Sequence, residues 1–216
     1  MSVDIIYCAG GNRRFAEIAI AEGFQYGTRH DYKPYHHEFG VPLTMVDINW
    51  KSYYWPDYTR KIAEWQPVIA MVPDYEHPDQ RQSMQDKARE LLALGVARPM
   101  CCPKFIGAVA HIPEWCVVAI SVPTTYAGFL PPVSELRGRR VHLLGGSPHA
   151  QIELIKYYGL MGVEVVSIDC NMHQKAAQLG TYFSGRKWRN MGAGKVSTDD
   201  AFRRSCQGIM RAMRVA

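Results

Sequence analysis

The chain alternates short, continuous apolar runs with longer segments in which apolar residues recur at helical spacing. Continuous runs rich in β-branched residues are typical of parallel strands that are covered on both faces. Segments with an apolar stripe at a period near 3.6 residues predict helices packed on such a sheet. Eight apolar runs predict strands, at residues 4–8, 24–28, 42–48, 68–72, 98–102, 117–122, 141–144 and 163–169.

The segments between these strands predict helices and loops. One helix begins at Pro148, with Ser147 as its N-cap, and is closed by Gly162. Residues 29–40 are too rich in His, Tyr and Pro for regular structure, so they predict a loop. The other helices are expected at residues 13–22, 55–65, 79–94, 105–115, 133–136 and 172–179, and from residue 198 onward.

Eight repeats of strand and helix predict an α/β fold, a compact (β/α)8 TIM-type barrel, with an open doubly wound sheet as the alternative. The 216 residues are close to the short limit of such barrels, which is about 200 residues. We expect the barrel to occupy residues 1–185. Residues 186–216 are expected to form a basic helical tail that packs on the barrel or extends it.

Composition narrows the class of protein. The chain has no apolar run of the ~18 residues that a membrane span needs, and its first residues show no secretion signal. We therefore expect a cytoplasmic protein, in the host cytoplasm if the source is viral. Six cysteines without a CxxC pair predict buried thiols rather than a disulfide framework or a zinc ribbon. No metal and no cofactor are expected.

The positive charge is concentrated at one end of the chain. Residues 186–216 carry a formal charge of +6, whereas the rest of the chain carries −1. Such a basic segment on a near-neutral body fits either a polyanionic partner or a solubilising helix face. The residues predicted to contact nucleic acid are Arg186, Lys187, Arg189, Lys195, Arg203 and Arg204.

Three predicted strands end on, or just before, an aspartate: Asp47, Asp74 and Asp169. In a barrel of parallel strands all carboxyl ends face the same mouth, so these side chains are expected to meet there. Neighbouring carboxylates separate in pKa, which suits a nucleophile working beside a general acid/base. Each aspartate could instead cap the helix that follows it. His142, inside a predicted strand, is interpreted as a satisfied core histidine.

The sequence around these aspartates resembles the tRNA-guanine transglycosylases. The segment LLGGSPHAQIELIKYYGLMGVEVVSIDCN resembles the late-barrel segment whose strand ends on the nucleophile, which falls on Asp169. PLTMVDINW resembles the strand with the second catalytic carboxylate, which falls on Asp47. PVIAMVPDYEHP resembles the strand whose aspartate grips the base, which falls on Asp74. The resemblance further implies base contacts from Ser121, Val122, Gly145 and Gly146.

The chain departs from that family in three ways. Ile48-Asn49-Trp50-Lys51 replaces the SGGF of the family motif, the cysteine-rich zinc signature is absent, and the chain is much shorter. These features resemble the short branch from phages and bacterial modification islands, which exchanges guanine in DNA for a 7-deazaguanine such as 7-cyano-7-deazaguanine. The resemblance implies single- or double-stranded DNA and the free base as partners, and it leaves a homodimer or a partner protein open.

The reaction implied by the resemblance is a retaining base exchange. Asp169 would attack C1′ and expel guanine, and Asp47 would move the protons. The residues are also compatible with two other functions. The protein could be a catalytically silent, nucleic-acid-binding subunit, as the lost SGGF motif would allow. It could also be a nucleoside deoxyribosyltransferase or hydrolase, which would not need the basic tail.

Overall fold

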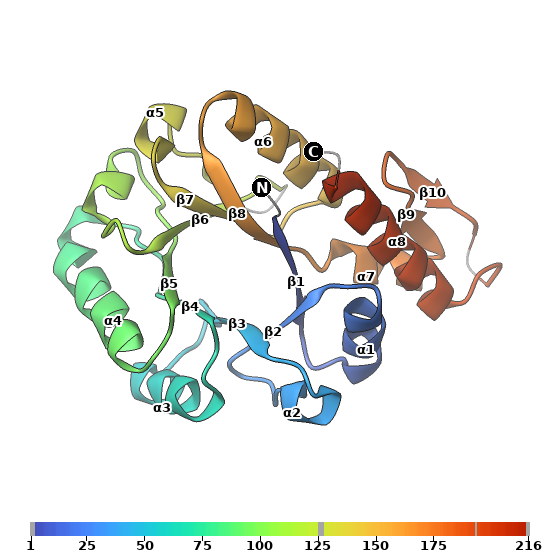
Figure 1. Ribbon diagram of the computed structural model, residues 1–216, viewed down its shortest axis with the longest axis horizontal. Coiled ribbons are helices and arrows are strands. Elements are labelled where there is room, and N and C mark those ends of the chain that lie inside the picture. The colour runs from blue at the N-terminus through green and yellow to red at the C-terminus, as the bar shows by residue number, and fades with distance from the viewer. Residues whose placement is uncertain (1–2, 125–127, 193, 215–216) are drawn as a thin grey trace.

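The computed structural model describes residues 3–124, 128–192 and 194–214. Eight parallel strands form a closed barrel in chain order, in which β8 pairs with β1 (Figure 1). The predicted (β/α)8 barrel is therefore confirmed, and the open sheet is wrong. Every strand begins and ends within one residue of its predicted bounds. The strands are β1 (Asp4–Ala9), β2 (Gln25–Arg29), β3 (Leu43–Asp47), β4 (Ile69–Met71), β5 (Arg98–Cys101), β6 (Val117–Ser121), β7 (Arg140–Leu144) and β8 (Glu164–Asp169).

Helices surround the barrel on its outer face (Figure 1). Two segments around the barrel differ from the prediction, and a hairpin near the C-terminal end, described below, was not predicted. The loop predicted at 29–40 contains a short helix, and the helix predicted at 105–115 is only a short 3₁₀ turn. Gly107 takes a φ of 86°, and Ile112 is extended before Pro113, so neither end can continue a helix. The helices are α1 (Arg13–Ala21), α2 (His36–Phe39), α3 (Trp55–Trp65), η1 (Pro78–Gln80), α4 (Arg81–Ala93), η2 (Ala108–His111), α5 (Val133–Leu136), α6 (Pro148–Leu160), α7 (Met172–Gln178) and α8 (Thr198–Met213).

Side chains fill the inside of the barrel. Ile6, Met45 and Met100 are fully buried there, because alternate residues of each strand point inward. The space is narrow at β2, where a Cβ on Gly27 would lie 3.0 Å from Ile6 Cγ2 and 3.3 Å from Met45 Cβ. The barrel is thus a packed core, and its chemistry belongs at the mouth, where the strands end.

The basic tail packs against the outer helices of the barrel. A two-stranded hairpin of β9 (Thr181–Phe183) and β10 (Trp188–Asn190) precedes α8, which packs beside α7 and α1 (Figure 1). Helix α8 buries Phe202 and Ile209. The boundary expected after residue 185 therefore falls inside a hairpin rather than between two domains. Within the described residues, no helix is long and apolar enough to cross a membrane.

One glycine allows the hairpin to dock on α8. A Cβ on Gly208 would lie 2.1 Å from the carbonyl oxygen of Phe183 and 2.8 Å from the amide nitrogen of Gly185. These neighbours are backbone atoms and cannot rotate away. We expect Gly208→Ala to lower the free energy of unfolding by about 3 kcal/mol, within the range of severe packing changes. Thermal and urea unfolding measure the effect.

Gly159→Ala is the matched control, because Gly159 also lies inside a helix, α6, but has open space where its Cβ would be. This substitution is expected to raise the free energy of unfolding by about 0.5–1 kcal/mol through helix propensity. Equal stability of the two variants would show that α8 and the hairpin are not in close contact.

Candidate active site

The strand ends bring three carboxylates to the barrel mouth. Asp47 is the last residue of β3, Asp169 is the last residue of β8, and Asp74 lies three residues beyond β4. Asp47 and Asp74 line a cavity of about 560 Å³, together with Lys104 and Ser121. Asp169 is buried next to this cavity, with 8% of its surface exposed, and its charge acts on Asp47.

Asp169 is held in a fixed orientation. Its Oδ1 accepts hydrogen bonds from the backbone N–H of Gly145 at 3.0 Å and from His142 Nε2 at 3.1 Å. His142 is fully buried, and its Nδ1 lies 2.8 Å from Ser167 Oγ. This arrangement fits an imidazole that donates through Nε2 and accepts the Ser167 hydroxyl proton at Nδ1. Both hydrogen bonds to the carboxylate within the described part of the chain end on Oδ1, so Oδ2 is the oxygen available for chemistry.

The glycine turn after β7 supports this carboxylate. Gly145 and Gly146 have φ values of 66° and 80°, a left-handed conformation that favours glycine. A Cβ on Gly146 would lie 2.4 Å from Val122 Cγ1. Gln151 Nε2 donates to the carbonyl oxygens of Asp169 at 2.6 Å and Gly145 at 2.7 Å. The turn, β8 and α6 are therefore linked into one rigid support.

The predicted base-binding residues differ in their surroundings. The Gly145 N–H already donates to Asp169, and Val122 is buried with its N–H bonded to the carbonyl oxygen of Leu144. The N–H groups of Gly145 and Val122 are therefore already used within the protein, and base contacts from Gly145, Gly146 and Val122 stay a prediction. Ser121 and Asp74 do line the cavity.

Asp47 has the most perturbed carboxyl group of the site. Burial, followed by the nearby negative charge of Asp169, raises the pKa of Asp47 to about 7. The Ile48 N–H, which donates to Oδ1 at 2.8 Å, and the Arg29 guanidinium oppose this shift only in part. Near neutral pH the carboxyl group is therefore close to half protonated, the condition that suits a group acting alternately as acid and base.

Cys8 lies near the same two carboxylates. Burial raises the pKa of its thiol well above the usual value, and the charges of Asp47 and Asp169 raise it further. A thiol of this kind stays protonated at neutral pH and is a poor nucleophile. The nucleophile of the mouth is therefore expected among the carboxylates. All six cysteines are buried free thiols, and within the described residues no three His, Cys, Asp or Glu side chains are placed to hold a metal ion.

An acceptor and a donor lie side by side on the wall of the mouth cavity. Lys104 Nζ is 3.1 Å from Asp74 Oδ2 and donates to Ser121 Oγ at 2.8 Å. Burial disfavours the Lys104 ammonium, but Cys102 and Asp74 outweigh it, so the pKa of Lys104 is raised. Lys104 therefore remains a cation and presents N–H donors beside a carboxylate acceptor.

The loop that replaces the SGGF motif carries exposed aromatic side chains. Trp50 lines the cavity and is 67% exposed, with Lys51 Nζ 5.1 Å from the centre of its ring. Tyr53 and Tyr54 follow in the same loop and are also exposed. Exposed aromatic rings beside a cation are the usual elements of a surface on which bases stack.

The predicted nucleic-acid-binding residues of the tail lie away from the mouth cavity. Arg186, Lys187 and Arg189 are exposed on or beside the β9–β10 hairpin, and Lys195 is exposed before α8. The hairpin lies at the outer edge of the barrel (Figure 1). Two of the α8 arginines contact residues of neighbouring elements. Arg203 pairs with Glu22 at 3.0 Å, and the Arg204 guanidinium lies 5.4 Å from the centre of the Tyr182 ring.

Comparison with known proteins gives a family and a fold. The sequence pattern of a family of unknown function (DUF6610) matches residues 19–214. The chain belongs to this family. No curated protein matches the DUF6610 chain.

Solved structures share its fold at low sequence identity. A truncated 3-deoxy-D-arabino-heptulosonate 7-phosphate synthase from Thermotoga maritima is 11% identical, with a TM-score of 0.56 over 99% of this chain and 87% of that one. The phospho-2-dehydro-3-deoxyheptonate aldolase from the same organism is 9% identical, with a TM-score of 0.57 over 100% and 69%. The YdjI aldolase from Escherichia coli K12 is 9% identical, with a TM-score of 0.54 over 99% and 90%. These likenesses show a fold shared with TIM-barrel enzymes.

Two residues of the DUF6610 site, His142 and Gln151, were not singled out as functional in the sequence. His142 is the buried, satisfied histidine that was expected, but its partner is Asp169. His142 lies two residues before the end of a predicted strand, so its side chain is expected to point into the barrel near the mouth. That position could have marked it as a candidate site residue. Gln151 carries no comparable signal, because its partner Asp169 comes from another βα unit. Lys104 was matched only loosely, with Pro103, to the position of the family's base-recognition glutamine.

Proposed function

We propose that this DUF6610 protein is a pentosyltransferase that exchanges guanine in DNA for a 7-deazaguanine, with 7-cyano-7-deazaguanine as the preferred base. One observation carries the proposal. Two carboxylates at the ends of β3 and β8 differ in environment, because Asp169 is fixed by His142 and Gly145 while the pKa of Asp47 is raised to about 7. Carboxylates made unequal in this way divide the roles of nucleophile and acid/base.

The first half of the proposed reaction removes guanine. Oδ2 of Asp169 forms a bond to C1′ of the deoxyribose as the bond from C1′ to guanine N9 breaks. Protonated Asp47 gives its proton to the departing base, so guanine leaves neutral and Asp47 becomes a carboxylate. The sugar is then held as an ester on Asp169. Before attack, His142 and Gly145 donate their hydrogen bonds to Oδ1, and this orients Oδ2, the reacting oxygen.

The second half installs the new base. The Asp47 carboxylate removes the N9 proton of the incoming 7-deazaguanine, and N9 forms a bond to C1′ as the ester to Asp169 breaks. The configuration at C1′ is retained after two displacements. Both aspartates return to their starting states, so the cycle consumes no oxidant and no additional acid.

Asp74 and Lys104 are proposed to read the base. A guanine edge presents N1–H and 2-amino donors beside the O6 acceptor, and 7-deazaguanines keep this edge. The Asp74 carboxylate would accept from the donors, and the Lys104 ammonium, 3.1 Å from it, would donate to O6. Adenine presents an amino donor at the corresponding position, so it would face the lysine cation and be rejected.

The target base must leave the helical stack to enter the cavity, at a cost of a few kcal/mol. Trp50, exposed on the cavity rim, would stack on that base or on a neighbouring one. Aromatic stacking contributes about 1–3 kcal/mol per base, enough to offset most of that cost.

The direct test offers the protein guanine-containing DNA and 7-cyano-7-deazaguanine and then quantifies the digested nucleosides by mass spectrometry. We expect the deazaguanine deoxynucleoside with the wild type and none with Asp169→Asn. Asp86→Asn, at an exposed position of α4, is the control and should retain full activity. An RNA substrate of the same sequence is tested in parallel. A wild-type protein that modifies neither polymer contradicts the proposal.

The outward position of the tail cations supports a second candidate, a nucleoside deoxyribosyltransferase. Substituting these cations can distinguish the two candidates, because a polymer bound at the mouth could also contact the hairpin whereas a free nucleoside could not. Deleting the tail is not informative, since α8 buries core residues of the wall. For a DNA-modifying enzyme, replacing Arg186, Lys187 and Arg189 by glutamine should weaken DNA binding and reduce the slope of log K against log salt by about 2 to 3.

Filter binding at several salt concentrations measures that slope. Exchange on a free deoxyguanosine substrate is the internal control and should not change in the triple variant. An unchanged salt slope, together with efficient exchange on the free nucleoside, would favour the second candidate.

A further inference from the structure

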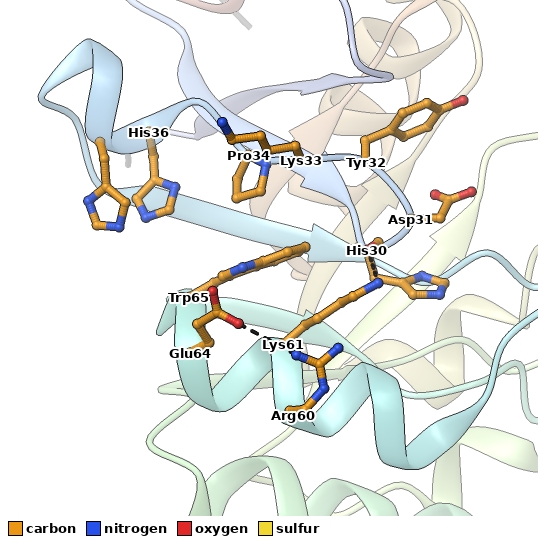
Figure 2. A pocket seen from close by; sticks show the side chains of 11 residues that line it. His30, Asp31, Tyr32, Lys33, Pro34, His36, Arg60, Lys61, Glu64 and Trp65 are labelled. Atoms are coloured by element: carbon orange, nitrogen blue, oxygen red, sulfur yellow. Dashed lines mark hydrogen bonds and ion pairs between the residues drawn. The ribbon is translucent and has the colours of Figure 1, made fainter.

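A second cavity, of about 410 Å³, lies on the outer side of β3 between α2 and α3. Among the residues that the structure describes, none lines both this cavity and the cavity at the mouth. Figure 2 shows His36 above the opening and Trp65, Lys61 and Arg60 below it, with the chain from His30 to Pro34 along one side. Aromatic and cationic groups thus face each other from two separate elements.

Three cationic side chains line this cavity. Lys33, Arg60 and Lys61 line it with two acids, Asp31 and Glu64. Asp31 is already neutralised, because Arg29 binds both of its oxygens at 2.5 and 2.7 Å and thereby lowers the pKa of Asp31. Glu64 and, outside the lining, Asp57 and Glu38 pair with the three cations, so the charges around the cavity balance.

The three cations differ in mobility. Lys61 Nζ is fixed by the carbonyl oxygen of His30 at 3.1 Å and by Asp57 at 2.9 Å. The Arg60 guanidinium bonds to Asp57 at 2.5 Å and lies 3.7 Å from Glu64, and Lys33 Nζ is 3.9 Å from Glu38. Arg60 and Lys33 are 63% and 80% exposed, so both can close on an anion that approaches from solvent.

The opposite wall carries a buried histidine with unused hydrogen-bonding capacity. His36 is 6% exposed, and its Nδ1 has no hydrogen-bond partner among the described residues. Burial, followed by His37, lowers the pKa of His36, so the ring is neutral at pH 7 and keeps one N–H. Its ring points toward the cavity, above Trp65 (Figure 2). Trp65 is only partly buried and offers an aromatic surface.

We propose that this cavity binds a nucleotide, with its phosphate between Lys33, Arg60 and Lys61 and its base against Trp65. Phosphate oxygens would replace the long contacts of Arg60 to Glu64 and of Lys33 to Glu38, and a flat ring fits the aromatic surface. The phosphate can belong to a free nucleotide or to a strand of nucleic acid. The inference does not rest on the proposed base exchange, because the two cavities are separate and no step of that chemistry uses these residues.

The cavity is nevertheless joined to the strand end that carries Asp47. The N–H of His30 donates to the carbonyl oxygen of Asp47 at 2.9 Å, and the N–H of Asn49 donates to His30 Nδ1 at 3.1 Å.

Isothermal titration with thymidine compounds tests the proposal, because the mouth cavity is proposed to select guanine. We expect thymidine 5′-monophosphate to bind, and thymidine and inorganic phosphate to bind at least about tenfold more weakly. Lys33→Gln combined with Arg60→Gln should raise the dissociation constant about tenfold, since two charged contacts are lost. Arg89→Gln is the matched control, because Arg89 is a similarly exposed arginine paired with an aspartate at i−3 on α4, and it should change the constant less than twofold.

An oligothymidylate without a 5′-phosphate distinguishes the two sources. If it binds and the double variant weakens it, the ligand is a nucleic-acid strand. If only the mononucleotide binds, the ligand is a free nucleotide. The proposal is overturned if neither compound responds to the double variant more than to Arg89→Gln, or if inorganic phosphate binds as tightly as the nucleotide. Deazaguanine incorporation by the same variants, measured on short DNA, reports separately on the proposed exchange.

Discussion

Asp169→Asn is expected to lower the rate of base exchange by at least about 10⁴-fold, which is the scale seen when a nucleophile is removed. Asparagine has the same shape, and its amide oxygen can still accept from Gly145 and His142, so the fold should be preserved. What is lost is the oxygen that forms the bond to C1′. Rates of deazaguanine incorporation into DNA, compared at equal protein concentration, measure the effect.

Unchanged thermal unfolding of this variant is the necessary control, because Asp169 also anchors the glycine turn. A variant that is fully folded and retains more than about 1% of the activity would contradict the assignment of Asp169. Such activity would place the nucleophile elsewhere in the mouth, with Asp47 as the remaining buried strand-end carboxylate.

Asp47→Asn is expected to lower the rate of base exchange by about 10²- to 10⁴-fold, the usual contribution of a general acid/base. In the wild type, the rate of guanine release in a single turnover should fall as pH rises through about 7, because Asp47 must carry the proton that it donates. In the variant this dependence should disappear. Quenched-flow measurement of released guanine between pH 5.5 and 8.5 tests both statements.

The same substitution should stabilise the protein above neutral pH. The folded carboxyl group holds its proton up to about pH 7, whereas in the unfolded chain it loses it near its ordinary value of 3.8. The folded state therefore binds more protons in this window, and its stability falls by up to about 1.4 kcal/mol per pH unit as pH rises. Asparagine removes this loss. A variant that loses activity and stability together at pH 8 would contradict the account of Asp47.

The barrel could be predicted from sequence because its strands are continuous apolar runs, which little else in a polar chain produces. The prediction of a helix at 105–115 was wrong. The composition of this segment permits a helix, but Gly107 and Pro113 make it a loop. The β9–β10 hairpin was missed because each strand has only three residues. Three residues are too few to show the alternation of apolar and polar positions that predicts a strand.

The candidate site was predictable in part. Strand ends place Asp47, Asp74 and Asp169 at one mouth whatever their neighbours are. The contacts that distinguish the three depend on register and on loops from other units. The pairing of β7 with β8 sets His142 beside Ser167, and Lys104 meets Asp74 only because the segments after β4 and β5 run side by side. Such contacts between distant segments cannot be predicted from a local sequence pattern.

The covalent intermediate is the most direct test of the proposed chemistry. Wild-type protein is incubated with guanine-containing DNA in the absence of a free base, denatured, digested and examined by mass spectrometry. The account predicts a deoxyribosyl adduct on the peptide that contains Asp169, formed together with free guanine, and no adduct in Asp169→Asn. An adduct on another residue, or guanine release that proceeds without any adduct in the wild type, would contradict it.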